Sequence, residues 1–183
     1  MIDEWLNLLR NATRDEFADR PVLMTLATVS RNQRPRARMI VCRAIDDDGT
    51  IWIIADARSR KNRQIRDEPR VEILFWLPSL RRQFRIRGKA AIERSNHPRS
   101  MHLWKSIPDA TRAMFTWPTP GDQRAMNNEA FARSLPADAI APEYFEAIAI
   151  HPTFVEELDL NPHPHRRRRW RHKCKWITEE LNP

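Results

Sequence analysis

A short apolar run leads directly into a basic one in Thr50-Ile-Trp-Ile-Ile-Ala-Asp-Ala-Arg-Ser-Arg-Lys-Asn-Arg-Gln-Ile-Arg66, the segment that decides the fold. Residues 50–55 are typical of a β-strand buried on both faces, because nearly all of them are apolar. Ser59 is a favourable helix N-cap, so we expect a helix to begin at Arg60 and to end near Pro69. The segment therefore predicts a helix that directly follows a buried strand.

The predicted helix carries positive charges at its unfavourable end. Arg60 and Lys61 fall in the first turn, where the helix dipole is already positive and cations are disfavoured. A bound anion would resolve the conflict, because exposed backbone N–H groups and two cationic side chains together make a phosphate site. A solvated basic helix in a basic protein is an alternative that the residues alone leave open.

Length and composition indicate a globular chain with acidic partners. The 183 residues suit one domain, 1–183, large enough to bury a core without disulfides or metals. Hydrophobic residues make up 41% of the chain and there are only 3 Gly, which excludes disordered and fibrous classes. The formal net charge of +8 favours phosphorylated small molecules, nucleic acid or an anionic membrane, and does not choose among them.

Cysteine spacing and hydropathy predict a soluble protein in a reducing compartment. Cys42 and Cys174 lie far apart and match no paired motif, so we expect both thiols to be reduced. No apolar run approaches the roughly 18 residues of a membrane span, and residues 1–6 lack the layout of a secretion signal. We therefore expect a cytoplasmic protein.

The rest of the chain is predicted to be mostly β-strands, with helices inserted. Helical patterns occupy residues 3–19, 98–115 and 122–134. Patterns typical of strands occupy residues 22–30, 36–45, 70–77, 80–92, 145–150, 153–160, 166–172 and 175–178. Five early strands, helical insertions and further strands predict one closed antiparallel barrel with helical decoration.

Two of the predicted strands carry cations in an alternating pattern. On the second strand Arg38 shares a face with Ile40. An arginine on a buried strand needs a partner, because an unpaired buried charge is strongly destabilising, and either a carboxylate or a phosphate would supply it. On the fifth strand Gln83, Arg85 and Arg87 share a face that suits an anionic ligand. For the two arginines we prefer a solvated outer surface.

Short motifs follow one another in a fixed order between about residues 20 and 95. They are Arg38-Met-Ile-Val-Cys-Arg43, Ser59-Arg-Lys61 with Gln64-Ile65, Pro69-Arg-Val71 with Phe75, Arg82-Gln83, and Gly88-Lys-Ala90. This order and spacing resembles the pyridoxamine 5′-phosphate oxidase family, the FMN-binding split barrels. A middle segment resembles the oxidase-related branch rather than the vitamin B6 enzyme; its residues are Leu103-Trp104, Arg112, Phe115, Trp117-Pro118 and Pro120-Gly121.

The resemblance implies FMN as the cofactor and assigns the residues that contact it. The residues that it assigns to the phosphate include those at the start of the predicted helix, together with Arg38 of the second strand. The phosphate residues are Arg38, Ser59, Arg60 and Lys61; the backbone contacts to the isoalloxazine ring are Met39, Ile40 and Val41; further flavin contacts are Gln83 and Arg168.

The chain departs from the family where the family binds its substrate. The first motif ends in Arg43 instead of a lysine that meets the substrate phosphate, which keeps the charge and changes its geometry. Where the family has a Tyr-Thr pair beside the flavin, this chain has Ile54-Ala55. Leu158 stands in place of the family's late tryptophan, and Pro164-His165-Arg166 stands in place of its Arg-x-His motif. Arg43 and Arg166 remain as substrate-binding candidates, and we expect a substrate other than pyridoxamine 5′-phosphate.

The family also implies a reaction class and an assembly. Flavin accepts a hydride and passes electrons to oxygen or another acceptor, so we expect an oxidoreductase acting on an unidentified small molecule. No side chain is a clear general acid or base. The family is dimeric with flavin lodged between the subunits, and we expect a homodimer here. Of Phe75 and Trp76 on the fourth strand, one must face outward, where an apolar residue suits a subunit contact.

Three rival functions remain open, and the carboxyl-terminal segment suggests the first two of them. A metal site would use His163, His165, His172 and Cys174, although no paired motif supports it. The arginines around Trp170 would suit a nucleic-acid-binding module. A haem-binding split barrel would use a histidine as axial ligand. The remaining alternative is a charged strand edge that discourages aggregation.

Overall fold

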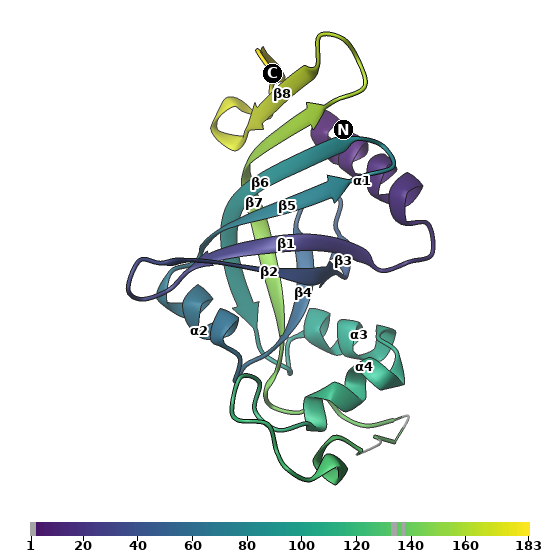
Figure 1. The fold of residues 1–183 in the computed structure, drawn as a ribbon, viewed down its shortest axis with the longest axis vertical. Coiled ribbons are helices and arrows are strands. Elements are labelled where there is room, and N and C mark those ends of the chain that lie inside the picture. Colours follow the sequence, from purple (N-terminus) through teal and green to yellow (C-terminus); the bar gives the residue numbers. More distant parts are fainter. Residues whose placement is uncertain (1–2, 133–134, 137) are drawn as a thin grey trace.

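A nine-stranded antiparallel sheet organises the computed structural model, which describes residues 3–132, 135–136 and 138–183 (Figure 1). The main path through the sheet is β2-β1-β5-β6-β7-β4-β3, with β8 on β7 and β9 on β8. The strands are β1 (Val22–Val29), β2 (Pro35–Cys42), β3 (Ala44–Ile45), β4 (Ile51–Asp56), β5 (Arg70–Leu77), β6 (Arg82–Glu93), β7 (Phe145–Asp159), β8 (Arg166–Arg171) and β9 (Glu179–Leu181). The helices are α1 (Glu4–Phe17), α2 (Arg60–Asp67), α3 (Pro98–Ser106) and α4 (Asp109–Ala113).

The long strands β6 and β7 divide the sheet into two halves. They pair along their length, from Arg82 opposite Asp159 to Glu93 opposite Ala147. The first half of β7 also pairs with β4, and its second half pairs with β8. β2 and β4 lie beside each other at the opening, with no ladder between them in the described part of the chain. The antiparallel barrel is confirmed, and it is split, as the resemblance implies, rather than closed.

A bulge allows β7 to run as one strand where two were predicted. Gly88 lies opposite Pro152, and the register shifts between Arg87 and Gly88. A Cβ on Gly88 would lie 2.4 Å from the carbonyl oxygen of His151, so the two backbones approach too closely for a side chain. Pro152 has no N–H for the ladder and is tolerated at this irregularity. The predicted break between residues 150 and 153 is therefore wrong.

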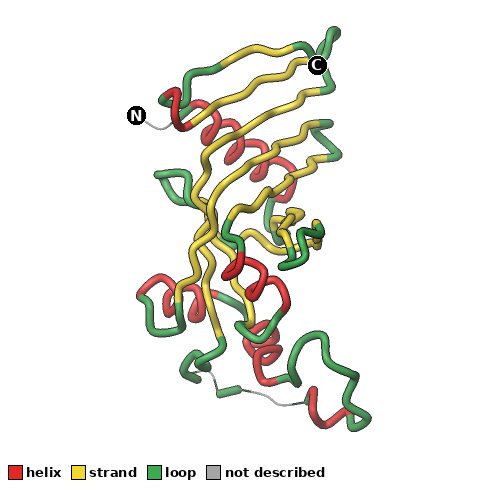
Figure 2. The backbone as a smooth tube through the Cα atoms, turned by 90° about the vertical axis from the view of Figure 1, so that its left-hand side faces the viewer, coloured by secondary structure: helices red, strands yellow, loops and turns green. Residues whose placement is uncertain are grey.

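Helices lie at both ends of the sheet (Figure 2). α1 lies toward the end that carries the termini, and it buries Trp5, Leu6 and Leu9 in the main hydrophobic core. α3 and α4 lie at the opposite end, where Trp104 and Phe115 belong to a second apolar cluster. No helix among the described residues is long and apolar enough to cross a membrane.

The predictions for two segments outside the main sheet are wrong. The helix expected over residues 122–134 is replaced, in its described part, by a short 3-10 helix, Asn128–Phe131, and residues 133 and 134 lie outside the described residues. Met126 is fully exposed, so a longer helix there would have little apolar surface to bury. The strand expected at 175–178 fails because Lys175 and Trp176 have φ of 52° and 56°.

Two further predictions hold in part. The helical region over 98–115 is confirmed, but Pro108 separates α3 from α4 because it cannot continue a helix. The second strand is interrupted at Arg43, whose N–H donates to the carbonyl oxygen of Trp52 at 2.8 Å between β2 and β3. Cys42 and Cys174 carry free thiols, as expected.

Gly88→Ala should lower the free energy of unfolding by about 1–3 kcal/mol, because the added Cβ overpacks against the backbone of β7. Chemical denaturation of the purified protein measures the change. Lys89→Ala is the matched control, since Lys89 is exposed on the same strand. Equal stability of the wild type and Gly88→Ala would contradict the close approach at the bulge.

Candidate functional site

Arg38 and the first turn of α2 face one cavity of 440 Å³, named here the cationic pocket. β2 supplies Arg38, and β4 leads into α2 through Ser59. The lining residues are Ser30, Arg36, Ala37, Arg38, Ser59, Arg60, Lys61 and Gln64. Every charged side chain in this set is a cation. The structure thus brings together the four residues that the sequence assigns to a phosphate.

Neutral oxygens alone hold the Arg38 guanidinium. It donates to the carbonyl oxygen of Leu26 at 3.1 Å, to Thr28 Oγ1 at 2.8 Å and to Gln64 Oε1 at 2.9 Å. Burial lowers the pKa of Arg38 from its ordinary value, and no carboxylate among the described residues opposes that shift. The cation is therefore fixed in position while its charge stays uncompensated.

Lys61 is the second cation in the pocket that forms no ion pair with the described carboxylates. Its Nζ donates to Ser59 Oγ at 3.1 Å. The pKa of Lys61 lies below the ordinary 10.5, chiefly because burial desolvates the ammonium; Asp56 opposes this shift and Arg38 adds to it. Asp56 is already engaged by Arg58, whose Nη2 lies 2.6 Å from its carboxylate. Arg38 and Lys61 are thus two mutually repelling, partly desolvated cations.

Helix α2 begins where the sequence predicts, with Ser59 in the N-cap position. The Ser59 side chain makes no capping hydrogen bond, and the first turn contains no acidic residue. Asn62 and Arg66 anchor the helix to β7, donating to Glu146 at 2.6 and 2.5 Å. The positive end of the helix therefore opens on the cationic pocket without an acidic side chain in its own first turn to offset it.

A larger cavity of 700 Å³, named here the apolar cavity, adjoins the cationic pocket at Lys61, which lines both. On the sheet side its walls include Ile40, Val41, Ile54 and Ala55. The opposite walls come from residues between 111 and 131. A flat apolar group here would connect directly to an anionic group in the cationic pocket.

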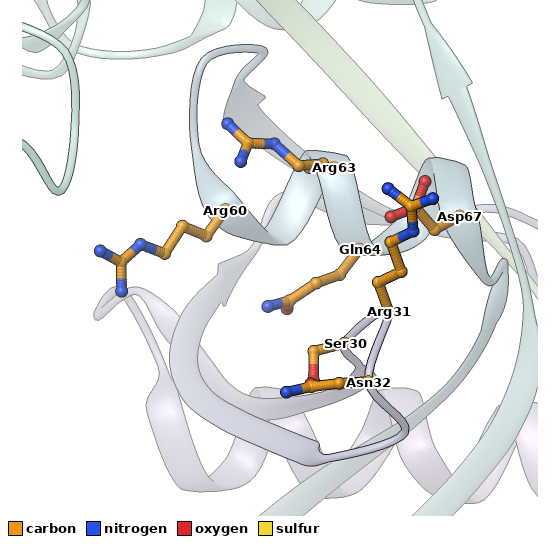
Figure 3. Close-up of a pocket in the computed structure, with 7 residues that line it drawn as sticks. All are labelled: Ser30, Arg31, Asn32, Arg60, Arg63, Gln64 and Asp67. Carbon is orange, nitrogen blue, oxygen red and sulfur yellow. The ribbon is translucent and has the colours of Figure 1, made fainter.

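The cationic pocket also continues outward along α2 (Figure 3). This outer cavity of 530 Å³ lies between the β1–β2 turn and the helix. Its lining residues are Ser30, Arg31, Asn32, Arg60, Arg63, Gln64 and Asp67. Arg60 and Arg63 extend from the helix away from the turn residues, which places Arg60 at the rim shared by both cavities.

Three predicted flavin contacts, Met39, Gln83 and Arg168, do not line these cavities. The Met39 side chain is 60% exposed, so only its backbone lies along β2 beside the site. Gln83 lies near the start of β6, opposite Trp76 of β5 and Leu158 of β7. This is the part of the sheet where β7 pairs with β8. Trp76 is 46% exposed while Phe75 is buried, so the expectation that one of the pair faces outward is confirmed.

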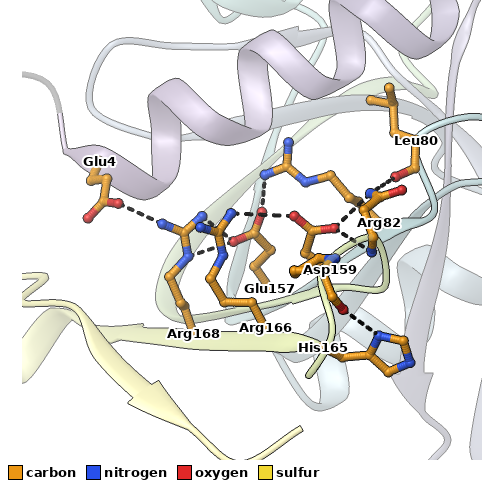
Figure 4. A network of polar contacts seen from close by, with 10 residues as sticks. Glu4, Leu80, Arg82, Glu157, Asp159, His165, Arg166 and Arg168 are labelled. Carbon is orange, nitrogen blue, oxygen red and sulfur yellow. Dashed lines mark hydrogen bonds and ion pairs between the residues drawn. The ribbon is translucent and has the colours of Figure 1, made fainter.

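Arg168 is engaged in a buried ion-pair network at the other end of the sheet (Figure 4). Its guanidinium lies 2.5 Å from Glu157, which is fully buried, and 2.9 Å from Glu4 of α1. Arg82 pairs with the same Glu157. Arg166 lies 3.4 Å from Asp159. Within one chain, neither Arg166 nor Arg168 joins the cationic pocket.

The other polar residues singled out from the sequence lie outside the cationic pocket. Arg85 and Arg87 both pair with Glu72, in agreement with an outer face of the sheet. His163 and His165 lie with their ring centres 5.0 Å apart. Among the described residues there is no group of three or more His, Cys, Asp or Glu that could hold a metal.

Sequence reasoning missed two features of the site. Gln64 accepts hydrogen bonds from both Arg38 and Thr28, and so joins β1, β2 and α2 behind the pocket. The i, i+4 spacing of Arg60 and Gln64 on a helix was a signal for this role. The walls from residues 111–131 were missed because the helix expected over part of them does not form.

Comparisons with known proteins point to one family. Residues 2–94 match the model of the family described as pyridoxamine 5′-phosphate oxidase, FMN-binding domain. A pyridoxine/pyridoxamine 5′-phosphate oxidase of Granulibacter bethesdensis is 31% identical over 98% of this chain and 88% of its own length. Another, from Thermosynechococcus vestitus, is 32% identical over 61% of this chain, and the match spans only 51% of that relative.

A solved structure extends the likeness to the whole fold. The crystal structure of a pyridoxamine 5′-phosphate oxidase-related, FMN binding protein from Nostoc punctiforme superposes with a TM-score of 0.88. The two proteins are 30% identical, and the match covers 100% of both chains. The split barrel and its C-terminal strands are therefore shared with that protein.

Arg168→Ala should lower the free energy of unfolding of the flavin-free protein by about 3 kcal/mol, because it removes one partner of a buried ion pair. Arg169→Ala is the matched control on the same strand. Its pair with Glu179 is about one-third exposed on each side and should contribute less than about 1 kcal/mol. Chemical denaturation compares them, and equal small losses would contradict the structural role of Arg168.

Proposed function

The chain belongs to the pyridoxamine 5′-phosphate oxidase FMN-binding family, and from this premise we propose that it is an FMN-dependent oxidoreductase acting on an unidentified small molecule. We assign residues 1–183 to one FMN-binding domain. The observation that carries the proposal is the pair of partly desolvated cations, Arg38 and Lys61, in the cationic pocket, of which Lys61 also lines the apolar cavity.

The two cations support a phosphate in the cationic pocket. A phosphate monoester carries about −1.5 to −2 charges at neutral pH and has three strong acceptor oxygens. It would offset the charges of Arg38 and Lys61, and Arg60 lies at the rim to add a third cation. The exposed N–H groups of the first turn of α2 and the Ser59 hydroxyl would complete the donors.

The apolar cavity supports the flavin ring beside that phosphate. The backbone of Met39, Ile40 and Val41 would lie along the ring, and Ile54 and Ala55 would contact it through apolar groups only. Bound FMN supplies hydride acceptance and electron transfer to oxygen or another acceptor. The residues of the chain bind the cofactor, orient it and exclude water; none is assigned as a general acid or base.

Of the two substrate-binding candidates, Arg43 is the better placed. It lines the apolar cavity, and burial lowers its pKa. Arg166 lines none of the three cavities described and lies beside Asp159. A single arginine in place of the family's lysine, together with the loss of two hydroxyls at Ile54-Ala55, supports a substrate other than pyridoxamine 5′-phosphate.

We further propose a homodimer with flavin at the subunit interface. Gln83, Leu158 and the exposed Trp76 lie together on the outer face of the sheet. Gln83 lines none of the three cavities of its own chain, so its assigned contact with flavin requires a second copy. Within its own chain the Arg168 guanidinium is paired with Glu157 and Glu4.

Substitution of both Arg60 and Lys61 by alanine should weaken FMN binding roughly a hundredfold or more, because two charge-assisted phosphate contacts are lost. Flavin fluorescence quenching measures the dissociation constant. Riboflavin, which has the ring and no phosphate, should bind the wild type and the double variant about equally.

The matched control for this pair is Arg63→Ala, which removes one cation from the same helix outside the cationic pocket. It should leave FMN affinity nearly unchanged. The phosphate assignment would be contradicted if the double variant bound FMN as tightly as Arg63→Ala does.

FMN affinity should fall as the pH rises through the alkaline range. Lys61 in the free protein has a pKa below 10.5, and phosphate favours the protonated ammonium. The contact is therefore complete below that lowered pKa and is lost above it. Lys61→Arg should move the fall to higher pH, because arginine stays protonated.

Dissociation constants for FMN across this range measure the effect, and riboflavin serves as the control for titration of the ring. Identical pH profiles for the wild type and Lys61→Arg would show that Lys61 does not hold the phosphate.

A further inference from the structure

We propose that the site also accepts FAD, with the flavin phosphate in the cationic pocket and the adenylate half in the outer cavity along α2. The inference rests on the proposed function, because it starts from a flavin whose phosphate lies in the cationic pocket. It goes further by assigning a ligand to a cavity that lies outside the FMN assignment, and by naming the residues that bind it.

The outer cavity begins where the assigned phosphate ends. Ser30, Arg60 and Gln64 line both the cationic pocket and the outer cavity. In FAD the phosphate of FMN is joined to a second phosphate, which carries adenosine. A ligand that leaves the cationic pocket past Arg60 therefore enters the outer cavity with its second phosphate first. The volume of 530 Å³ falls within the roughly 300–1,000 Å³ typical of small-molecule sites.

The arginines of the outer cavity are free to bind that second phosphate. Arg31, Arg60 and Arg63 are exposed, and their side chains form no hydrogen bond or ion pair with the described residues. Every arginine of β8, by contrast, forms an ion pair with a carboxylate. Because the exposed guanidinium groups have no partner to leave, Arg60 and Arg63 can turn toward an anion at little cost. Charge-assisted contacts of this kind favour a phosphate at the inner end of the cavity.

The polarity of the cavity changes along α2. Arg60, Gln64 and Asp67 follow one another on successive turns of the helix, over about 10 Å at 1.5 Å per residue. Asp67 is the only acidic residue among the lining residues, and it forms no ion pair with the described part of the chain. A carboxylate repels phosphate and accepts hydrogen bonds from hydroxyl and amino groups. The outer end of the cavity therefore suits the donors of a nucleoside, and the inner end suits its phosphate.

Arg31 lies at the nucleoside end of the cavity. Its side chain extends from the β1–β2 turn toward Asp67 of α2 (Figure 3). A guanidinium group stacks on aromatic faces as well as binding anions. Arg31 would therefore cover the adenine ring, while Asp67 accepts a hydrogen bond from the adenine amino group or from the ribose.

The β1–β2 turn is held in place without a ligand. The Ser30 hydroxyl donates to Asn32 Oδ1 at 2.7 Å, and the Ser30 N–H donates to the carbonyl oxygen of Arg34 at 2.9 Å. The side-chain oxygen of Asn32 is thereby occupied, and its NH₂ group is left to donate. Gln64 Oε1 is likewise occupied by two donors behind the pocket, which leaves its own NH₂ group for the ligand. Two amide donors are thus positioned before binding, which lowers the entropy cost of binding.

The test compares FAD with FMN on protein prepared without flavin, and isothermal titration calorimetry gives both dissociation constants. The FAD constant should lie no more than tenfold above the FMN constant, because the outer cavity supplies donors to the second phosphate. Arg63→Ala should weaken FAD binding about tenfold, since it removes one charge-assisted contact. The same variant should leave FMN affinity nearly unchanged, because Arg63 lines the outer cavity and not the cationic pocket.

Two further variants separate the nucleoside contacts from a general loss of charge. Asp67→Ala should weaken FAD binding severalfold and leave FMN affinity unchanged, although it makes the cavity more positive. Arg34→Ala is the matched control, because it removes an exposed cation of the same turn that lines neither the outer cavity nor the cationic pocket. It should change neither constant.

FAD binding more than tenfold weaker than FMN binding would overturn the inference, and so would equal effects of Arg63→Ala on the two flavins. AMP provides a further test on the FMN-loaded protein, where it should not bind at micromolar concentrations because its phosphate is repelled by that of FMN. Tight binding of AMP there would show a separate site for free nucleotides and would overturn the assignment to FAD. A protein that binds neither flavin would instead refute the proposed function.

Discussion

The site depends on two positive charges that the chain holds close together, partly out of water and without an ion pair to a carboxylate among the described residues. Neutral oxygens of Leu26, Thr28 and Gln64 fix Arg38, and the Ser59 hydroxyl orients Lys61. Each of the two cations raises the free energy of the other. The repulsion between the two cations lowers the stability of the free protein. Binding of an anion removes this repulsion, so the ligand stabilises the folded state.

The split barrel gives these charges their position. β2, which carries Arg38, is at the end of the sheet path, and β4 delivers α2 to the same opening. Because β2 and β4 lie side by side without a ladder in the described part of the chain, their ends leave room for the apolar cavity. Asn62 and Arg66 lock α2 onto β7, so the helix N-terminus cannot turn away from the opening.

The sequence predicted the parts of the molecule that local rules control. The buried strand before α2, the N-cap at Ser59 and the clustering of Arg38 with Arg60 and Lys61 all follow from propensity, helix electrostatics and motif order. The features that were not predicted depend on contacts between segments that are distant in the sequence. Pro152 looked like the end of a strand until Gly88 was seen opposite it, and Arg168, assigned to flavin by its place in a motif, has its guanidinium held by Glu157 and Glu4 from distant segments. The cavity walls from residues 111–131 were not predicted, because the helix expected over residues 122–134 is replaced in its described part by a short 3-10 helix and the packing of Phe131 on Trp117 joins segments that no local pattern connects.

The central electrostatic claim is tested most directly by phosphorus NMR of bound FMN, after FMN has been added to protein prepared without flavin. The second pKa of a free phosphate monoester lies at about 6. Between Arg38 and Lys61 at the positive end of α2, the bound phosphate should stay dianionic and its resonance should not shift as the pH is lowered through this value. A resonance that titrates as it does in free FMN would show that the phosphate lies outside the cationic pocket.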